Sequence, residues 1–530
     1  MLKFPIFAVI LRLAYFVFLK MASIYDPLYR LIKRLTMPEK RFLLRYMTYI
    51  VAKPARYVAL FRTLDGLSVF EPTLLHTYFS GIPPKRLAAL ARRLYRLLLN
   101  GMNQYHAPRQ TDTRLREALG HIAVLREKGL HEQALVIAAD AYQLAIKHEK
   151  WAFIPLLSYQ QKGLVEALSY IGFSEDALKR ISRDEQNALD KLANIDEYWL
   201  LQAQLYYHHN RNGIARAAND VDKIAAVFQH SLLRDEERAL CFDAKLLLYK
   251  VYSTYFFIVR DITNCYKYSL KTLQLLGAEP LLKTEHLPAY IHALNNMLNL
   301  TSMMGNDEER QKYLDELEQM WHDEALLASE TVRIKLFEAY YYHQMTFCLS
   351  QNQFEEGLKF VADMQNGMLA YGDRLDKMGK IMLCFYGFHI CFGADQYDDA
   401  HQWLQNIITD PDSSRLRQDI YTFAQILRLP VAYEMNQPKQ LQKAIIEVRD
   451  FLTHKDRPYR FETIVLQLLQ NLHLRENYEQ GSLFIDLLAQ LQQLADDNFE
   501  RKAFAYFDFP KWVQAKIVGQ SLGERIKANV

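Results

Sequence analysis

Histidine, cysteine and carboxylate side chains are the groups that could carry chemistry in this chain, and their spacing matches no common catalytic or metal site. His208 and His209 form the one adjacent histidine pair, but neighbours on a helix point about 100° apart and suit a shared metal poorly. The chain contains no phosphate loop, no Gly-x-Gly-x-x-Gly, no His-Glu-x-x-His and no Gly-x-Ser-x-Gly. We therefore expect a non-enzymatic protein without metal or cofactor. An active site assembled from distant residues stays open as the alternative.

The five cysteines give no sign of disulfides or of a metal-binding pair. None belongs to a Cys-x-x-Cys pair, and all lie in stretches with helical apolar spacing. Buried free thiols are the simplest interpretation, and they fit a reducing, cytoplasmic compartment. The residues are Cys241, Cys265, Cys348, Cys384 and Cys391.

A short phrase that recurs along the chain is the strongest structural signal. It runs from an aromatic residue through acidic or Gln residues to a closing Ala or Gly, and each copy separates two apolar helical patterns. Acidic residues favour the positive end of a helix dipole, and a small residue lets two helices approach closely. The clear copies are Phe173-Ser174-Glu175-Asp176-Ala177, Phe354-Glu355-Glu356-Gly357, Tyr397-Asp398-Asp399-Ala400 and Tyr478-Glu479-Gln480-Gly481, with looser ones at 130–134 and 305–310.

The composition predicts that nearly the whole chain is helical. Glycine (19) and proline (16) are scarce among the 530 residues, and both weaken or break helix interiors. No proline falls between Pro155 and Pro280 or between Pro288 and Pro411, and no run alternates strictly between apolar and polar residues. We predict an all-α protein of stacked helical hairpins, because one hairpin cannot bury its apolar face alone.

The phrase and its surroundings resemble the tetratricopeptide repeat family. The likeness rests on 129–134 (Gly-Leu-His-Glu-Gln-Ala) with Ala141, on Gly172-Phe173 with Ala177, and on the aromatic and small residues of the later phrases. It spans about residues 111–500 and implies an α-solenoid, a right-handed superhelix of stacked antiparallel helix pairs. The chain departs from the family because adjacent copies lie 43 or 47 residues apart rather than about 34, and because the usual proline after the second helix is mostly missing.

A basic helical head followed by long repeats is also similar to bacterial helical-repeat proteins, and that likeness implies no activity. The repeat resemblance does imply that the first helix of each pair lines a concave groove. Positions 15 and 11 before each closing small residue would then face the groove, with intermediate repeats closing at Cys265 and Leu441. Leu294, Met297 and Leu298 would belong to the core.

The implied groove residues are Lys162, Glu166, Lys250, Thr254, Asn295, Asn299, Tyr342, Thr346, Phe385, His389, Leu466 and Gln470. A solvated helix surface is the alternative at each of these positions. Tyr342, Phe385 and His389 are the candidate anchors for a bound peptide, because aromatic side chains dominate many interfaces.

Residues 21–110 are predicted to form a small basic helical domain. Residues 1–110 hold 18 Lys and Arg against 4 Asp and Glu, a net charge of +14, whereas the remainder holds 46 against 57, a net charge of −11. The sequence Thr36-Met37-Pro38-Glu39 is a capping box. Helices are predicted from this box to about 50, and over 54–64, 72–79 and 84–102.

The last of these predicted helices places arginines beside its leucine face, at Arg86, Arg92, Arg93 and Arg96. With the preceding short helix and turn, it could contact nucleic acid as a helix-turn-helix. It carries no Asn or Gln signature for reading bases. The alternative is a cationic surface that docks on the acidic repeats or stays solvated.

The first twenty residues form a separate apolar segment. Residues 4–19 are apolar except for Arg12, and 16 residues are short for a membrane span, which needs about 20. Three interpretations remain: an upstream start codon before a true start at Met21, a packing helix, or an N-terminal membrane anchor. Residues 501–530 are predicted to form a C-terminal cap or tail.

These patterns predict a cytoplasmic helical-repeat scaffold that binds a protein or peptide partner in its groove. The alternative is a nucleic-acid-associated regulator, in which the basic head binds DNA or RNA and the repeats sense a partner.

Overall fold

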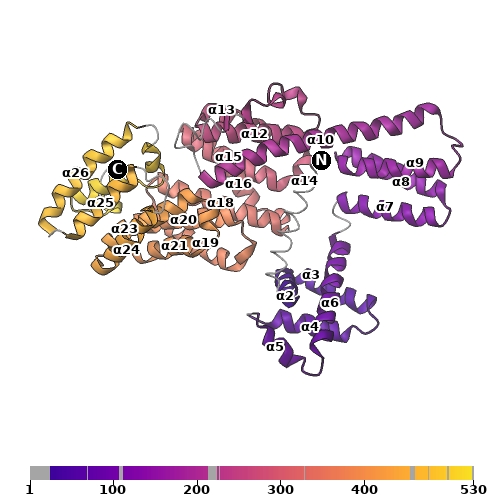
Figure 1. Cartoon of the computed structure of the whole chain (residues 1–530), viewed down its shortest axis with the longest axis horizontal. Helices are drawn as coiled ribbons and strands as arrows, with labels where there is room; N and C mark the ends of the chain where they lie inside the picture. The colour runs from indigo at the N-terminus through magenta and orange to yellow at the C-terminus, as the bar shows by residue number, and fades with distance from the viewer. Residues whose placement is uncertain are drawn as a thin grey trace. The chain divides into compact units, whose positions relative to one another are not determined.

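The structure is a computed structural model that describes residues 24–68, 70–106, 111–212, 224–225, 227–327, 329–453, 460–474, 477–497 and 500–527. All regular secondary structure in these ranges is helical, which confirms the predicted all-α class. The chain divides into two compact units, 1–189 and 190–530, within α10 (Glu175–Asn212; Figure 1). No helix in the described ranges is both long and apolar enough to cross a membrane. The interpretations of residues 1–20 concern a segment outside these ranges.

The basic head at the start of the first unit is a cluster of five helices around its own apolar core. The helices are α2 (Tyr25–Arg34), α3 (Met37–Ile50), α4 (Ala55–Gly66), α5 (Pro72–Tyr78) and α6 (Pro84–His106). The predicted capping box is confirmed: the Thr36 side chain accepts from the Glu39 backbone, and the Glu39 carboxylate accepts from the Thr36 backbone N–H at 2.7 Å. Leu87, Leu94 and Leu98 of α6 are fully buried, as its leucine spacing predicts.

The rest of the first unit consists of helices that pack in chain order. They are α7 (Thr111–Glu127), α8 (His131–Lys147), α9 (Ile154–Ala167) and the beginning of α10. α8 packs against both α7 and α9. Ala134, Ala138 and Ala141 on α8 are buried, so small side chains bring these helices close together.

The second unit continues the pattern, since most of its helices pack against the helices before and after them (Figure 1). Its helices are the remainder of α10, α12 (Phe242–Val259), α13 (Ile262–Gly277), α14 (Pro280–Glu285), α15 (Leu287–Met304), α16 (Asp307–Trp321), α17 (Glu324–Leu327), α18 (Glu330–Ser350), α19 (Phe354–Tyr371), α20 (Lys377–Gly393), α21 (Tyr397–Thr409), α22 (Ser413–Leu416), α23 (Gln418–Glu434), α24 (Pro438–Thr453), α25 (Arg460–Leu474), α26 (Asn477–Ala495), α27 (Phe509–Ile517) and α28 (Leu522–Lys527). Leu294, Met297 and Leu298 on α15 are buried, as predicted.

One backbone turn recurs between paired helices. At six places a residue with positive φ follows the end of the first helix of a pair, and the second helix begins two residues later. After α9 the turn is longer: the closing bond follows Ser169, and Gly172 is a further positive-φ residue three positions before α10. At most copies the N–H of the residue after the positive-φ position donates to a carbonyl five residues earlier, which closes the end of the helix. The positive-φ residues are Gly129, Gly172, Arg260, Gly305, Asn352, Asp395 and Asn436. The turns at Arg260 and Asn436 precede α13 and α24, the helices that hold the intermediate closing positions Cys265 and Leu441.

The recurring phrase begins the second helix of a pair, as its acidic residues predict. Glu355 and Glu356 lie in the first turn of α19, and Asp398 and Asp399 lie in the first turn of α21. At the closing position of the α19 copy, a Cβ on Gly357 would lie 2.6 Å from a methyl carbon of Ile390. A small residue is therefore required where α19 meets α20.

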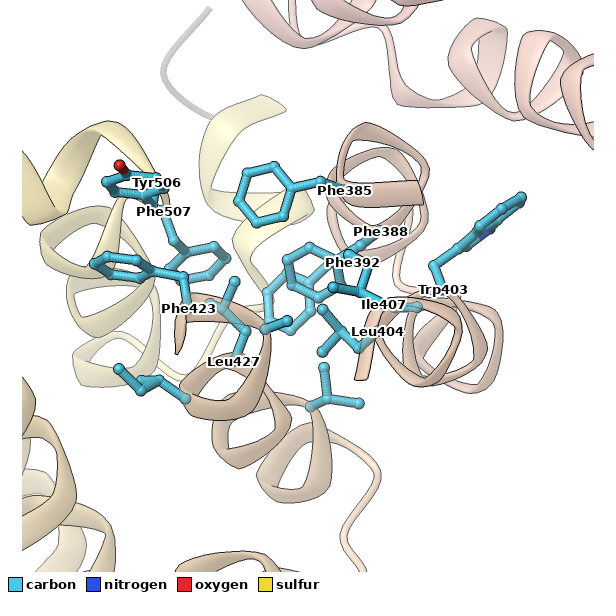
Figure 2. Close-up of a cluster of buried hydrophobic side chains, with 14 of the residues drawn as sticks. Phe385, Phe388, Phe392, Trp403, Leu404, Ile407, Phe423, Leu427, Tyr506 and Phe507 are labelled. Carbon is cyan, nitrogen blue, oxygen red and sulfur yellow. The ribbon is translucent and has the colours of Figure 1, made fainter. Parts of the chain in front are cut away.

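The largest core lies in the second unit and joins helices that are distant in sequence. Phe388 and Phe392 of α20 lie in one cluster with Phe423 of α23 and with Phe507, which precedes α27 (Figure 2). The rings of Phe392 and Phe507 are 5.3 Å apart and edge-to-face.

The C-terminal segment packs back onto earlier helices of the same unit. The Trp512 indole N–H donates to Glu434 Oε1 at 2.7 Å, and Lys516 pairs with the same carboxylate. The Ser521 hydroxyl donates to Asp395 Oδ2 at 2.9 Å. A Cβ on Gly523 would lie 2.3 Å from the Gly393 carbonyl oxygen, so α28 approaches the end of α20 through a glycine.

The turn at Asn352 gives a test of the recurring backbone geometry. Asn352 has φ of 57°, which is costly for a β-branched residue and free of strain for glycine. We expect Asn352→Val to lower the free energy of unfolding by about 1–2 kcal/mol, and Asn352→Gly to leave it unchanged or raise it. Urea unfolding of the two variants and the wild type measures the difference. Equal stability of the two variants would contradict the assigned turn.

Candidate functional site

A groove in the second unit is the candidate functional site. It encloses about 500 Å³ and is lined by α10, α12, α13, α15, α18 and α20, by the beginning of α23, and by residues 505–506. On several of these helices the lining residues follow helical spacing, as with His292, Asn295 and Asn299 on α15. Each such helix therefore presents one stripe of side chains to the same space.

Two hydrogen bonds from α18 fix the asparagine side chains of the α15 stripe. The Tyr342 hydroxyl donates to Asn299 Oδ1 at 2.9 Å. His343 Nε2 lies 2.8 Å from Asn295 Oδ1, and the imidazole donates there as a neutral ring. Burial is the larger cause and the positive charge of Arg310 the smaller one, and together they lower the pKa of His343 to about 3. The ring therefore stays neutral. Because both amide oxygens are engaged, the amide N–H groups are left as donors beside the groove.

Lys250 adds a cation to this array of donors. Its side chain is half-buried on α12 and lines the same groove. Among the described residues no ion pair to its ammonium group is found. Burial lowers the pKa of Lys250, with Asp243 acting in the opposite direction. An anionic group entering the groove would supply the missing counter-charge.

Two other cations in the groove are already paired. Lys335 Nζ lies 2.9 Å from Glu338 Oε2 and 3.6 Å from Asp376 Oδ2. The Arg417 guanidinium holds both oxygens of Asp419, at 2.8 and 2.7 Å. Arg260, which follows α12, also lines the groove, and among the described residues no ion pair to its guanidinium is found. Lys250, Arg260 and the α15 amides are therefore donors of the described lining that lack a carboxylate partner.

The pair of Arg417 and Asp419 also ties the C-terminal segment to the groove. The Tyr506 hydroxyl donates to Asp419 Oδ2 at 2.7 Å, and Arg417 Nη1 lies 3.3 Å from the Met382 sulfur. Burial alone would raise the pKa of Asp419, but hydrogen bonds from Arg417 and Tyr506 lower it to about 2. The charged groups of the groove near α23 therefore already have partners within the chain.

The described lining of the groove carries hydrogen-bonding groups, charged groups and a thiol. Cys265 is its thiol, and burial raises the pKa of that thiol to about 11, so at neutral pH it stays protonated and weakly nucleophilic. All five cysteines are buried thiols outside any disulfide, as predicted. Within the described ranges, no group of three or more histidine, cysteine or carboxylate side chains is placed to hold a metal.

The structure brings half of the implied groove residues together. The ones that line the groove are Lys250, Thr254, Asn295, Asn299, Tyr342 and Phe385. Thr346 lies on α18 and donates to the backbone of His343 at 3.0 Å, outside the lining. Leu466 packs against the core, and the side chain of Gln470 is outside the described residues.

Two of the three predicted peptide anchors lie in positions that disfavour this role. Phe385 is only 5% exposed and belongs to the core. His389 does not line the groove, because its ring stacks on Phe507 of the C-terminal segment at 6.0 Å. The chain's own C-terminal segment thus covers the end of the groove where these anchors were expected. Tyr342 is half-buried and does line the groove.

The remaining predicted residues lie in the first unit. Lys162 forms an ion pair with Glu185 of α10, and Glu166 is exposed on α9. The predicted nucleic-acid contacts Arg86, Arg92, Arg93 and Arg96 are all exposed on α6, after the predicted short helix and turn.

Sequence reasoning missed two kinds of groove residue. His292 and Glu338 extend the predicted stripes by one helical turn and Lys335 by two, so helical spacing could have found them. Arg417, Asp419 and Tyr506 come from the beginning of α23 and from the C-terminal segment. Nothing in local spacing links these two places.

Comparison with protein-family models, with curated proteins and with solved structures finds no match. The groove is therefore interpreted from its own geometry.

The buried, neutral His343 predicts how stability depends on pH. An unfolded histidine has a pKa of about 6.5, whereas the pKa of the native group is about 3. The unfolded state therefore binds more protons below pH 6.5, and the free energy of unfolding falls as the pH drops. His343 should contribute about 2 kcal/mol to the fall between about pH 7 and pH 5.

The variant His343→Gln keeps a side-chain N–H donor but has no imidazole to protonate. We expect its free energy of unfolding to fall by about 2 kcal/mol less than that of the wild type over this pH range. Denaturant unfolding at both pH values measures the difference. His322→Gln, at an exposed histidine of the same unit, is the control. An unchanged pH dependence in His343→Gln would show that the imidazole is not held neutral.

Proposed function

We propose that this chain is a non-enzymatic scaffold that binds an extended peptide segment of a partner protein in the groove of its second unit. The recurring turn and the packing of helices in chain order support a right-handed α-solenoid of the tetratricopeptide type. In such a stack, first helices present their stripes side by side along one wall. The stripes of α12, α15 and α18 fit this arrangement.

The observation that carries the proposal is the orientation of the α15 amides. Tyr342 and His343 hold the oxygens of Asn299 and Asn295, so the amide N–H groups and the Lys250 ammonium remain as donors in one groove. An extended peptide offers a row of backbone carbonyl oxygens that matches such donors. The unpaired charge of Lys250 favours a peptide with a carboxylate, either a side chain or a C-terminus.

The paired ions give the groove its direction. Near α18 and α23, Lys335 and Arg417 already have carboxylate partners, so a second carboxylate would meet like charge there. We expect the anionic residue of the peptide to lie at the α12 end and its uncharged residues to lie along α15 and α18.

A peptide selection tests this function. The full chain is immobilised and used to select from a random peptide library displayed on phage. We expect enriched peptides to contain a carboxylate, and Lys250→Met to weaken their binding by about 10- to 100-fold, the effect of a lost charged hydrogen bond. Fluorescence anisotropy with synthetic versions of the enriched peptides measures the affinities.

The matched control is Lys267→Met, since Lys267 is an exposed lysine of α13 that does not line the groove. It should bind the peptides as the wild type does. If no peptide is enriched, or if both lysine variants bind equally well, the proposed function is wrong.

A further inference from the structure

A second groove, in the basic head, is separate from the site described above. It encloses about 630 Å³ between α3 and the C-terminal end of α6. Its walls carry two arginines and four rings, which are Arg41, Arg45, Phe42, Tyr46, Tyr49 and Tyr105.

The close crossing of α3 and α6 builds this groove. A Cβ on Gly101 would lie 2.5 Å from Leu43 Cδ2 and 2.9 Å from Tyr46 Cδ1, so the helices meet at a glycine. One turn later on α6, the Tyr105 ring lies 5.1 Å from the Phe42 ring. Phe42 stacks in turn beside Tyr46, with ring centres 6.1 Å apart and planes within 16°.

Two large apolar side chains at the end of α3 are exposed to solvent. Tyr49 is 89% exposed and Ile50 is 55% exposed, and both line the groove. The core of the head is complete without them, since Leu43 and Met47 supply the buried side of α3. Adjoining exposed apolar side chains beside a groove are typical of a binding surface rather than of a folding requirement.

The charge of this groove is uniformly positive. Arg41 and Arg45 lie one turn apart on the exposed side of α3. In the described ranges no ion pair to either guanidinium is found, and no carboxylate lines the groove. The nearest carboxylate along α3, Glu39, is engaged by the Thr36 cap. The complement of this surface is a ligand that is both polyanionic and aromatic.

We propose that the α3–α6 groove of the head binds single-stranded nucleic acid, with bases stacked on Tyr49, Tyr46 and Tyr105 and with phosphates at Arg41 and Arg45. Rings and cations along one strip are the chemistry that such ligands need, because every base has a π-face and every linkage carries a charge. The alternation of arginines and rings along α3, at 41, 42, 45, 46 and 49, matches the alternation of phosphates and bases.

This ligand is favoured over a lipid surface and over a DNA duplex. The described lining holds four aromatic rings but only two aliphatic residues, Pro38 and Ile50. This composition favours the stacking of bases over contact with acyl chains. A duplex hides the faces of its bases, so the rings would have nothing to stack on. Duplex binding would instead use an exposed basic helix such as α6.

Fluorescence anisotropy of the full chain with labelled single strands of about 12 nucleotides tests the proposal. Oligothymidylate and oligouridylate are the two probes, and they distinguish DNA from RNA as the source of the strand. We expect Tyr49→Ala to weaken binding by roughly 5- to 100-fold, the effect of losing one stacked base. Because Tyr49 is almost fully exposed, this change should not affect folding.

The double variant Arg41→Gln with Arg45→Gln tests the phosphate contacts. Its slope of log affinity against log salt should be shallower than that of the wild type by about 1.4, corresponding to two phosphate contacts on a single strand. Titrations between about 50 mM and 200 mM salt give this slope.

The matched control is Arg86→Gln with Arg93→Gln, two exposed arginines of α6 that do not line the groove. We expect this variant to bind single strands within about twofold of the wild type, because those arginines lie outside the proposed contact. Three results would each overturn the proposal. They are no binding of either single strand by the wild type, a loss confined to the α6 variant, and retention by phosphatidylserine vesicles without retention of single strands.

Discussion

The left-handed turn between paired helices is the constraint on which the rest of the structure depends. At six copies it follows the end of the first helix, closes its last carbonyls and lets the second helix begin two residues later. A turn of fixed geometry sets the angle between the two helices of a pair, and therefore the direction in which the next pair must pack. Where the residue is not glycine, as at Arg260 and Asp395, the backbone strain is accepted because the packing on both sides determines the conformation.

The second unit uses the resulting stack in two ways. Outside the groove, aromatic side chains of α20, α23 and the C-terminal segment form one continuous core. Along the groove, α12, α15 and α18 present stripes of amides, hydroxyls and charges. The polar residues hold one another: Tyr342 orients Asn299, His343 orients Asn295, and Asp419 joins Arg417 to Tyr506. Such a network costs little reorganisation when a ligand enters, which favours recognition.

Sequence patterns predicted the local features of this fold well. The capping box at Thr36, the helices that begin at the acidic phrases, and the buried triplet of α15 all follow from interactions within a few residues. The sequence patterns did not predict the features that depend on contacts between residues distant in the chain. The spacing of residues along the sequence could not show that Phe507 would cover His389, because 117 residues separate the two in the chain. For the same reason it could not show that Tyr506 would complete the groove. The helix α10 runs without interruption for 38 residues, which contain no glycine or proline.

The central claim is that the donors of α12 and α15, beside α18, face an open groove that receives a peptide. Hydrogen–deuterium exchange of the full chain, with and without a peptide selected on it, measures this most directly. The account predicts that added protection concentrates in α12, α15 and α18. Protection confined to the first unit, or to α24–α26, would show that the peptide binds elsewhere and would contradict the claim.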